Sequence, residues 1–95
     1  NWKVVMSVKG ETLNDIGLLI DFHDLKAILK KICNDLDHKN VNEVEPFDKI
    51  NPSSENIANY IATRAQGELD RTAQGLSVES VTVWESDTSR CTYYP

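Results

Sequence analysis

A single apolar stripe at helical spacing constrains the fold of this chain more than any other feature. Its six members recur at intervals of three and four residues, and they are Leu25, Ile28, Leu29, Ile32, Cys33 and Leu36. A helix with such a stripe must bury it against another layer of structure. Asp21 precedes the stripe as a candidate N-cap, and Asp24 adds favourable negative charge to the first turn. The sequence therefore predicts an amphipathic helix from Asp21 through Leu36.

Three other segments have the pattern of β-strands. Residues 2–9 alternate between apolar and polar side chains, as in a strand with one face buried. Residues 78–85 and 90–94 also predict strands, and the polar residues 86–89 between them predict a tight turn. The last two segments therefore form a candidate antiparallel hairpin.

A second helix is predicted to begin at Ser53 or Ser54, where serine can cap the first turn. It should fray or end between Gly67 and Gly75, because glycine weakens a helix. Residues 37–52 contain two prolines and no periodicity, which predicts a loop. The order strand, helix, helix, strand, strand favours an α+β fold, with both helices on one face of an antiparallel sheet.

Composition narrows the functional classes. Ninety-five residues are enough for one domain, which we expect to span 1–95, and 40% hydrophobic residues are ordinary for a globular protein. A net charge of −5 argues against nonspecific binding to nucleic acids or anionic membranes. No apolar run is long enough to cross a bilayer. The two cysteines lack the spacing of a zinc knuckle or redox pair, which favours a reduced, cytoplasmic location.

Asp37 and His38 are the first candidates for chemistry. A carboxylate can orient an imidazole, which then transfers protons near neutral pH. Neighbouring residues within a helix point about 100° apart, so the pair cooperates only if the helix has ended by His38. The alternative is a helix C-terminus that favours a histidine because the helix dipole attracts a cation there.

Glu85 and the serines at the second helix are the other candidates. On strict alternation Glu85 falls on the apolar face of its strand, so its carboxylate lies either in water at the end of the sheet or buried with a partner. A carboxylate of this kind can accept two N–H groups from a flat heterocycle. Ser53 and Ser54 are more simply helix caps. The chain's two histidines are too few for a catalytic zinc site, which uses three protein ligands.

Several blocks of the sequence together carry a resemblance to a known family. They are Leu36-Asp37-His38, Asn51-Pro52-Ser53-Ser54-Glu55-Asn56, and Trp84-Glu85 with Thr88-Ser89-Arg90. In their order and spacing these blocks resemble the 6-pyruvoyl-tetrahydropterin synthase and 6-carboxy-tetrahydropterin synthase family. The resemblance implies the tunnelling fold, in which subunits join their sheets edge to edge. It also implies a homo-oligomer, a trimer or hexamer, with active sites between subunits.

The same resemblance implies roles for the candidate residues. Asp37 and His38 would form a proton-relay pair, Glu85 would anchor the pterin, and Ser53 and Ser54 would flank it. The implied substrate is 7,8-dihydroneopterin triphosphate. We expect the carboxy-forming branch, which breaks a carbon–carbon bond and serves 7-deazaguanine (queuosine) synthesis, with the pyruvoyl-forming branch as the alternative.

The family also implies a catalytic Zn²⁺, which polarises side-chain oxygens of the substrate. Its histidine ligands and the catalytic cysteine belong before the position of Asn1, so we expect no metal ligands in this chain. The domain is therefore expected to lack its first strand and to be inactive alone. One alternative is a non-catalytic relative that binds pterin or supports assembly, and another is an acidic α+β domain that resembles the family by chance.

Overall fold

The computed structural model describes residues 3–11, 20–37, 43–72 and 75–95 of the chain. Its described elements have the predicted order of strand, helix, helix, strand and strand. They are β1 (Lys3–Gly10), α1 (Phe22–Asp37), α2 (Ser54–Thr72), β2 (Leu76–Trp84) and β3 (Arg90–Tyr93). Trp2, which was included in the first predicted strand, lies outside the described residues.

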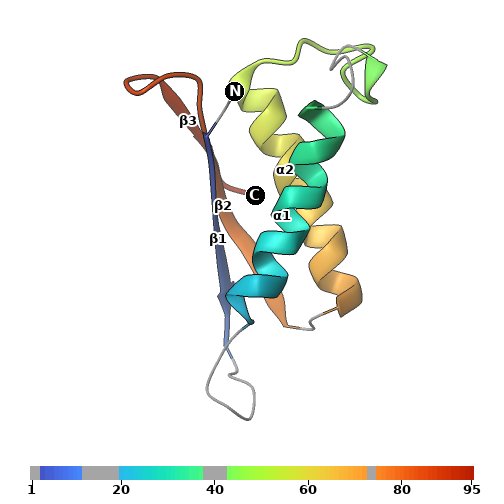
Figure 1. Ribbon diagram of the computed structural model, residues 1–95, viewed down its shortest axis with the longest axis vertical. Coiled ribbons are helices and arrows are strands. Elements are labelled where there is room, and N and C mark those ends of the chain that lie inside the picture. Colours follow the sequence, from blue (N-terminus) through green and yellow to red (C-terminus); the bar gives the residue numbers. More distant parts are fainter. Residues whose placement is uncertain (1–2, 12–19, 38–42, 73–74) are drawn as a thin grey trace.

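The three strands form one antiparallel sheet in the order β1-β2-β3. Both helices cover the same face of this sheet (Figure 1), as the sequence predicted. Side chains of β2 alternate between the two faces, so Val81 and Val83 are completely buried beneath the helices. The α+β architecture is therefore confirmed, and it is the layer arrangement of the tunnelling fold.

Helix α1 begins where its cap was predicted. The backbone N–H of His23 donates to Asp21 Oδ1 at 2.8 Å, which satisfies one of the first-turn amides. Ile32 and Leu36 are buried, whereas the other members of the stripe are only half-buried. The reason is the position of α1 at the edge of the helical layer, where α2 is its main neighbour. The helix also includes Asp37, which the sequence assigned to the following loop.

Helix α2 is the central element of the core. Its buried face meets β2 and β3 on one side and α1 on the other, and it comprises Ile57, Ala58, Ile61, Ala62, Ala65 and Leu69. The helix continues past Gly67 and ends at Thr72, inside the predicted interval. Leu69 is completely buried, and this burial holds the final turns against the sheet.

The connection from α2 to β2 is fixed by a side-chain amide and by a glycine. The Gln66 amide accepts from the Val78 N–H at 2.8 Å and donates to the Leu76 carbonyl at 3.1 Å. Gly75 has a φ of 81°, in the region that glycine adopts without steric cost. These contacts fix the start of β2, a strand of nine residues that ends at Trp84.

The ends of several elements meet at one end of the molecule. The last turn of α1, the first turn of α2 and the turn between β2 and β3 all lie there (Figure 1). Predicted site residues occur on each of these three segments. In the described ranges, neither helix combines the length and the apolar character needed to cross a bilayer.

Candidate functional site

A pocket of about 430 Å³ opens between the start of α2 and the β2–β3 turn. It brings together Ser53, Ser54 and Glu85, which the sequence analysis assigned to substrate binding. The serines come from the entry to α2, and Glu85 follows β2 directly. Three predicted binding residues that are distant in sequence therefore line one hollow, although their roles stay predictions.

The two serines have different structural duties. Ser53 is the N-cap of α2, because its Oγ accepts from the Asn56 N–H at 3.2 Å. Its carbonyl accepts from the Ile57 N–H at 2.8 Å, which starts the helical ladder. Ser54 is the first helical residue, and the first amides of any helix have no carbonyl partner within it. The entry to α2 therefore presents hydroxyl groups and amide donors to the pocket.

Glu85 lies just beyond the sheet and is exposed to solvent. The sequence left open a buried or a solvated carboxylate, and the structure has the solvated one. The backbone of Glu85 is nevertheless fixed, because its N–H donates to the Ser89 carbonyl at 2.9 Å. The Ser86 Oγ accepts from the Ser89 N–H at 3.2 Å and closes the same turn. The Glu85 carboxylate thus lies on an ordered turn, where both of its oxygens can accept N–H groups of a ligand.

The predicted proton-relay pair falls at the edge of the described structure. Asp37 is the last residue of α1, and α1 ends at the same end of the molecule as the start of α2 and the β2–β3 turn (Figure 1). The side chain of Asp37 and the whole of His38 lie outside the described residues. Their cooperation therefore stays a prediction.

Arg90 and Cys91 also line the pocket, although neither was predicted from sequence as a site residue. Partial burial, and to a lesser degree the Glu55 carboxylate, raise the pKa of the Cys91 thiol. A thiol with a raised pKa is protonated at neutral pH, so Cys91 is poorly suited to act as a nucleophile. Arg90 pairs with Trp84 across the hairpin. The predicted turn at 86–89 would have placed Arg90 opposite Glu85, so no correct signal for this pairing was available from sequence.

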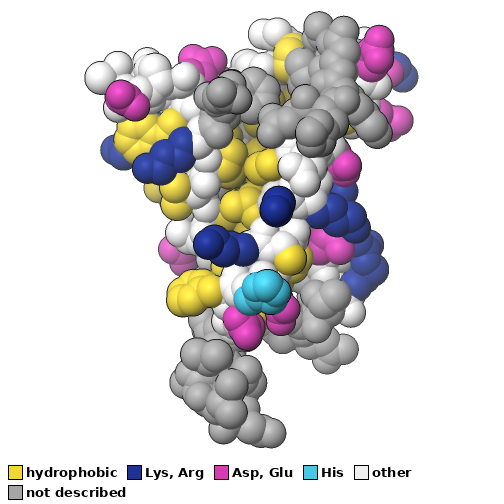
Figure 2. Space-filling model, viewed as in Figure 1, with side chains coloured by type: hydrophobic (Ala, Val, Ile, Leu, Met, Phe, Trp, Pro, Cys, Tyr) yellow, Lys and Arg dark blue, Asp and Glu magenta, His cyan; other side chains and the backbone are white. Residues whose placement is uncertain are grey.

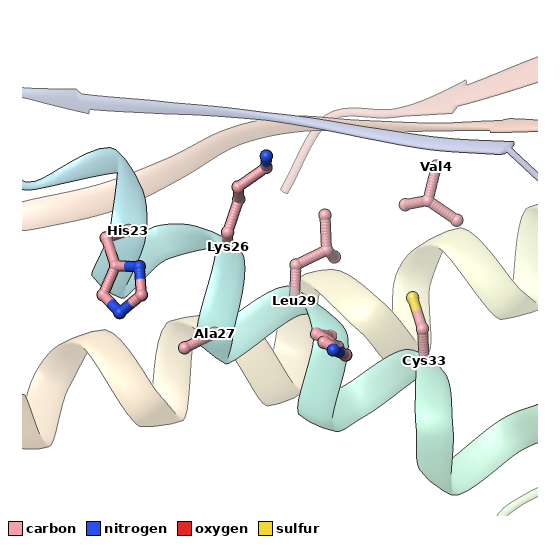
Figure 3. A pocket seen from close by; sticks show the side chains of 7 residues that line it. Val4, His23, Lys26, Ala27, Leu29 and Cys33 are labelled. Atoms are coloured by element: carbon pink, nitrogen blue, oxygen red, sulfur yellow. The ribbon is translucent and has the colours of Figure 1, made fainter.

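A larger hollow, of about 630 Å³, lies between α1 and β1. Figure 2 shows its hydrophobic floor with basic side chains beside it, and Figure 3 shows Val4, Leu29 and Cys33 turned toward it. His23 and Cys33 lie near opposite ends, ten residues or about 15 Å apart along α1. They cannot act on the same small group, and no predicted site residue lines this hollow.

The described residues do not fit a catalytic zinc ion. No group of three or more histidine, cysteine, aspartate or glutamate side chains in that part of the chain is arranged to hold a metal. A catalytic zinc site uses three protein ligands with one open position. We therefore derive no chemical step through zinc from these residues.

Comparison with known proteins gives a consistent set of relatives. A 6-pyruvoyl tetrahydrobiopterin synthase from Dictyostelium discoideum is 38% identical over 63 residues, which cover 64% of this chain and 47% of that protein. The 6-carboxy-5,6,7,8-tetrahydropterin synthase of Bacillus subtilis is 32% identical over 99 residues, covering 99% of this chain and 65% of that enzyme. A dihydroneopterin monophosphate aldolase from Pyrococcus furiosus is 30% identical over 80 residues, covering 84% of this chain and 62% of the relative.

The names of these relatives all refer to pterin compounds, although the activities that they name differ. The chain spans between 47% and 65% of the length of the three proteins. The family model described as 6-pyruvoyl tetrahydropterin synthase matches residues 1–95, the whole of this sequence. With the antiparallel sheet and its two helices, this match shows that the chain belongs to the 6-pyruvoyl tetrahydropterin synthase family.

Proposed function

We propose that this chain provides the pterin-binding side of the active site of a pterin lyase. The supporting observation is the single pocket lined by Ser53, Ser54 and Glu85. The flat edge of a pterin carries an amino group and a ring N–H side by side, and both can donate to the Glu85 carboxylate. The hydroxyl groups and first amides of α2 would meet the remaining polar atoms of the ring.

The proposed substrate is 7,8-dihydroneopterin triphosphate, and the proposed product is 6-carboxy-5,6,7,8-tetrahydropterin. The reaction consumes water and releases acetaldehyde and triphosphate, and the ring gains the hydrogens that the side chain loses. No external reductant is therefore required. The Bacillus subtilis relative, whose match covers 99% of this chain, supports this branch.

Elimination of triphosphate to a pyruvoyl product is the second candidate. The Dictyostelium discoideum relative favours it by its higher identity, 38%, over a shorter match. Both reactions move protons between the ring and the side chain. We assign this transfer to His38, oriented by Asp37, because an imidazole exchanges protons near neutral pH. We also propose that the protein is a cytoplasmic homo-oligomer of three or six subunits.

Binding of 7,8-dihydroneopterin to the intact protein, measured by calorimetry, tests the pocket. Glu85→Gln removes the negative charge and one hydrogen-bond acceptor, and we expect the variant to bind about tenfold more weakly. This loss is at the lower end of the range for hydrogen bonds to charged groups, because Glu85 is exposed. Asp87→Asn is the matched control, since Asp87 is an exposed carboxylate on the same turn that does not line this pocket. Equal affinities for Glu85→Gln and Asp87→Asn would contradict the proposed pterin contact.

Product analysis separates the candidate functions. Acetaldehyde release from 7,8-dihydroneopterin triphosphate identifies the carboxy-forming branch, and triphosphate release without acetaldehyde identifies the pyruvoyl-forming branch. Pterin binding with neither product identifies the non-catalytic relative that the sequence left as an alternative.

A further inference from the structure

One turn of α2 contacts the chain on both sides of segment 38–42. On the side that precedes this segment, Arg64 Nη1 donates to Asp35 Oδ2, near the end of α1, at 2.8 Å. On the side that follows it, the ring of Phe47 packs against the ring of Tyr60, with 5.3 Å between the two centroids. Phe47 is almost completely buried, so this second contact belongs to the core. Two side chains of one helix therefore hold both flanks of the segment.

Tyr60 and Arg64 are also joined to each other. Residues four apart lie on the same face of a helix, so their side chains can meet. Arg64 Nη1 donates to the Tyr60 hydroxyl at 3.0 Å, and Arg64 Cζ lies 5.7 Å from the centroid of the Tyr60 ring. Both side chains are half-buried. The guanidinium is thus oriented by two oxygens and one aromatic ring, and its position determines where the Asp35 carboxylate can lie.

The last turn of α1 is restrained by two different kinds of contact. Leu36 is buried in the core, and this burial fixes how closely the helix approaches α2 and the sheet. The hydrogen bond of Asp35 to Arg64 is directional, and it acts on a side chain that points about 100° away from Leu36 around the helix axis. Together the two contacts fix both the depth and the rotation of the turn that ends at Asp37.

We propose that Tyr60 and Arg64 are positioning residues for the proton transfer that the proposed function assigns to His38. The inference rests on that function, and neither residue lines the pocket that contains Glu85. Because the pair holds both flanks of segment 38–42, it limits where the imidazole can lie relative to the bound pterin. A displacement of about 1 Å at a reacting group can lower a rate about a hundredfold. The pair therefore controls turnover without contributing to the affinity for the pterin.

The competing explanation is that Arg64 only stabilises the packing of the two helices, which lie side by side (Figure 1). A second ion pair between these helices separates the two explanations, since Lys31 Nζ lies 3.3 Å from Glu68 Oε2. Lys31 precedes Asp35 by four residues, or about 6 Å along α1, and is farther from the end of the helix. Loss of either ion pair weakens the same helix contact, but only the loss of Arg64 releases the last turn of α1.

Two measurements on the intact protein test the proposal: kcat with 7,8-dihydroneopterin triphosphate, and the Kd of 7,8-dihydroneopterin by calorimetry. Arg64→Gln should lower kcat about tenfold through misplacement of the reacting group, and it should leave Kd unchanged within about twofold. Tyr60→Phe keeps the ring contact but removes one hydrogen bond, so kcat should fall about threefold. Lys31→Gln is the matched control, and it should change neither quantity by more than about twofold. Arg64→Lys keeps the positive charge and should recover part of the lost kcat.

A kinetic double-mutant cycle identifies the residue through which Arg64 acts. If Arg64 acts by positioning His38, adding Arg64→Gln to His38→Ala should lower kcat by less than about a further twofold. A purely structural role predicts instead that the two losses multiply. Multiplied losses, an unchanged kcat in Arg64→Gln, or equal losses in Arg64→Gln and Lys31→Gln would overturn the positioning role. If the unmodified protein does not turn over the triphosphate by either candidate reaction, the proposed function fails and the inference fails with it.

Discussion

Ser53 and Ser54 are adjacent serines that the structure assigns to different tasks, so their alanine variants should behave differently. Ser53→Ala removes the oxygen that accepts the Asn56 N–H at 3.2 Å and leaves that amide without its cap. The backbone bond from the Ile57 N–H to the Ser53 carbonyl, at 2.8 Å, is retained. The loss is therefore that of one N-cap, about 1 kcal/mol. For a domain of this size it corresponds to a fall in Tm of about 4–8 °C.

Thermal and urea unfolding of the intact protein, followed by circular dichroism, test this expectation. Ser54→Ala should change Tm by less than about 2 °C, because alanine is a good helix former at the first helical position. Ser53→Asp should restore the cap, since aspartate at the N-cap accepts the same amide and also favours the helix dipole. Equal destabilisation by Ser53→Ala and Ser54→Ala, or failure of Ser53→Asp to recover stability, would refute the assignment of Ser53 as the cap.

Three other expectations concern the core, the contact between the helices and the response to pH. Ile61 is completely buried, so Ile61→Ala should cost about 3 kcal/mol in denaturant unfolding. A double-mutant cycle with Asp35→Asn and Arg64→Gln should give a coupling free energy of about 0.5–1 kcal/mol, because the two side chains are 42% and 28% exposed. A coupling near zero would show that this ion pair does not stabilise the packing of α1 on α2. The hydrogen bond from Lys31 lowers the pKa of Glu68. The stabilisation by the ionised Glu68 carboxylate is therefore complete above the ordinary carboxylate pKa of about 4.3, and it is lost as the pH falls through the lower pKa of the folded state. In that acidic range the Tm of the Glu68→Gln variant should depend less on pH than the Tm of the unmodified protein.

The elements that were predicted from sequence are those set by local patterns. The Asp21 cap precedes the helix it predicted, and the stripe through Leu36 lies within α1. The last two strands were predicted from alternating apolar and polar residues and a polar turn between them, and the structure has this antiparallel β2–β3 hairpin. The end of β2 was predicted one residue too late, at Glu85. Alternation alone does not show where pairing stops, whereas the bond from the Glu85 N–H to the Ser89 carbonyl begins the turn at that residue.

The composition of the pocket was only partly accessible from sequence. Ser53, Ser54 and Glu85 were identified through the family resemblance, since a serine cap or a strand-end carboxylate is common in any domain. Arg90 and Cys91 join them because β3 folds back beside α2, and this contact is tertiary. The burial of the α1 stripe was overestimated for a similar reason. Periodicity shows which face of a helix is apolar, but the neighbouring elements decide how much of that face they cover.

The exposure of Glu85 limits how tightly the described residues alone can hold a pterin. A carboxylate in water exchanges hydrogen bonds to water for hydrogen bonds to the ligand, so the net gain is small. The same pairing is stronger where water is excluded, because the effective dielectric constant falls. The ordered turn between Glu85 and Ser89 provides the orientation of the carboxylate but not the dry surroundings. Tight binding at this pocket therefore requires a surface that covers the turn from the solvent side, and an active site formed between subunits, as the family resemblance implies, would meet that requirement.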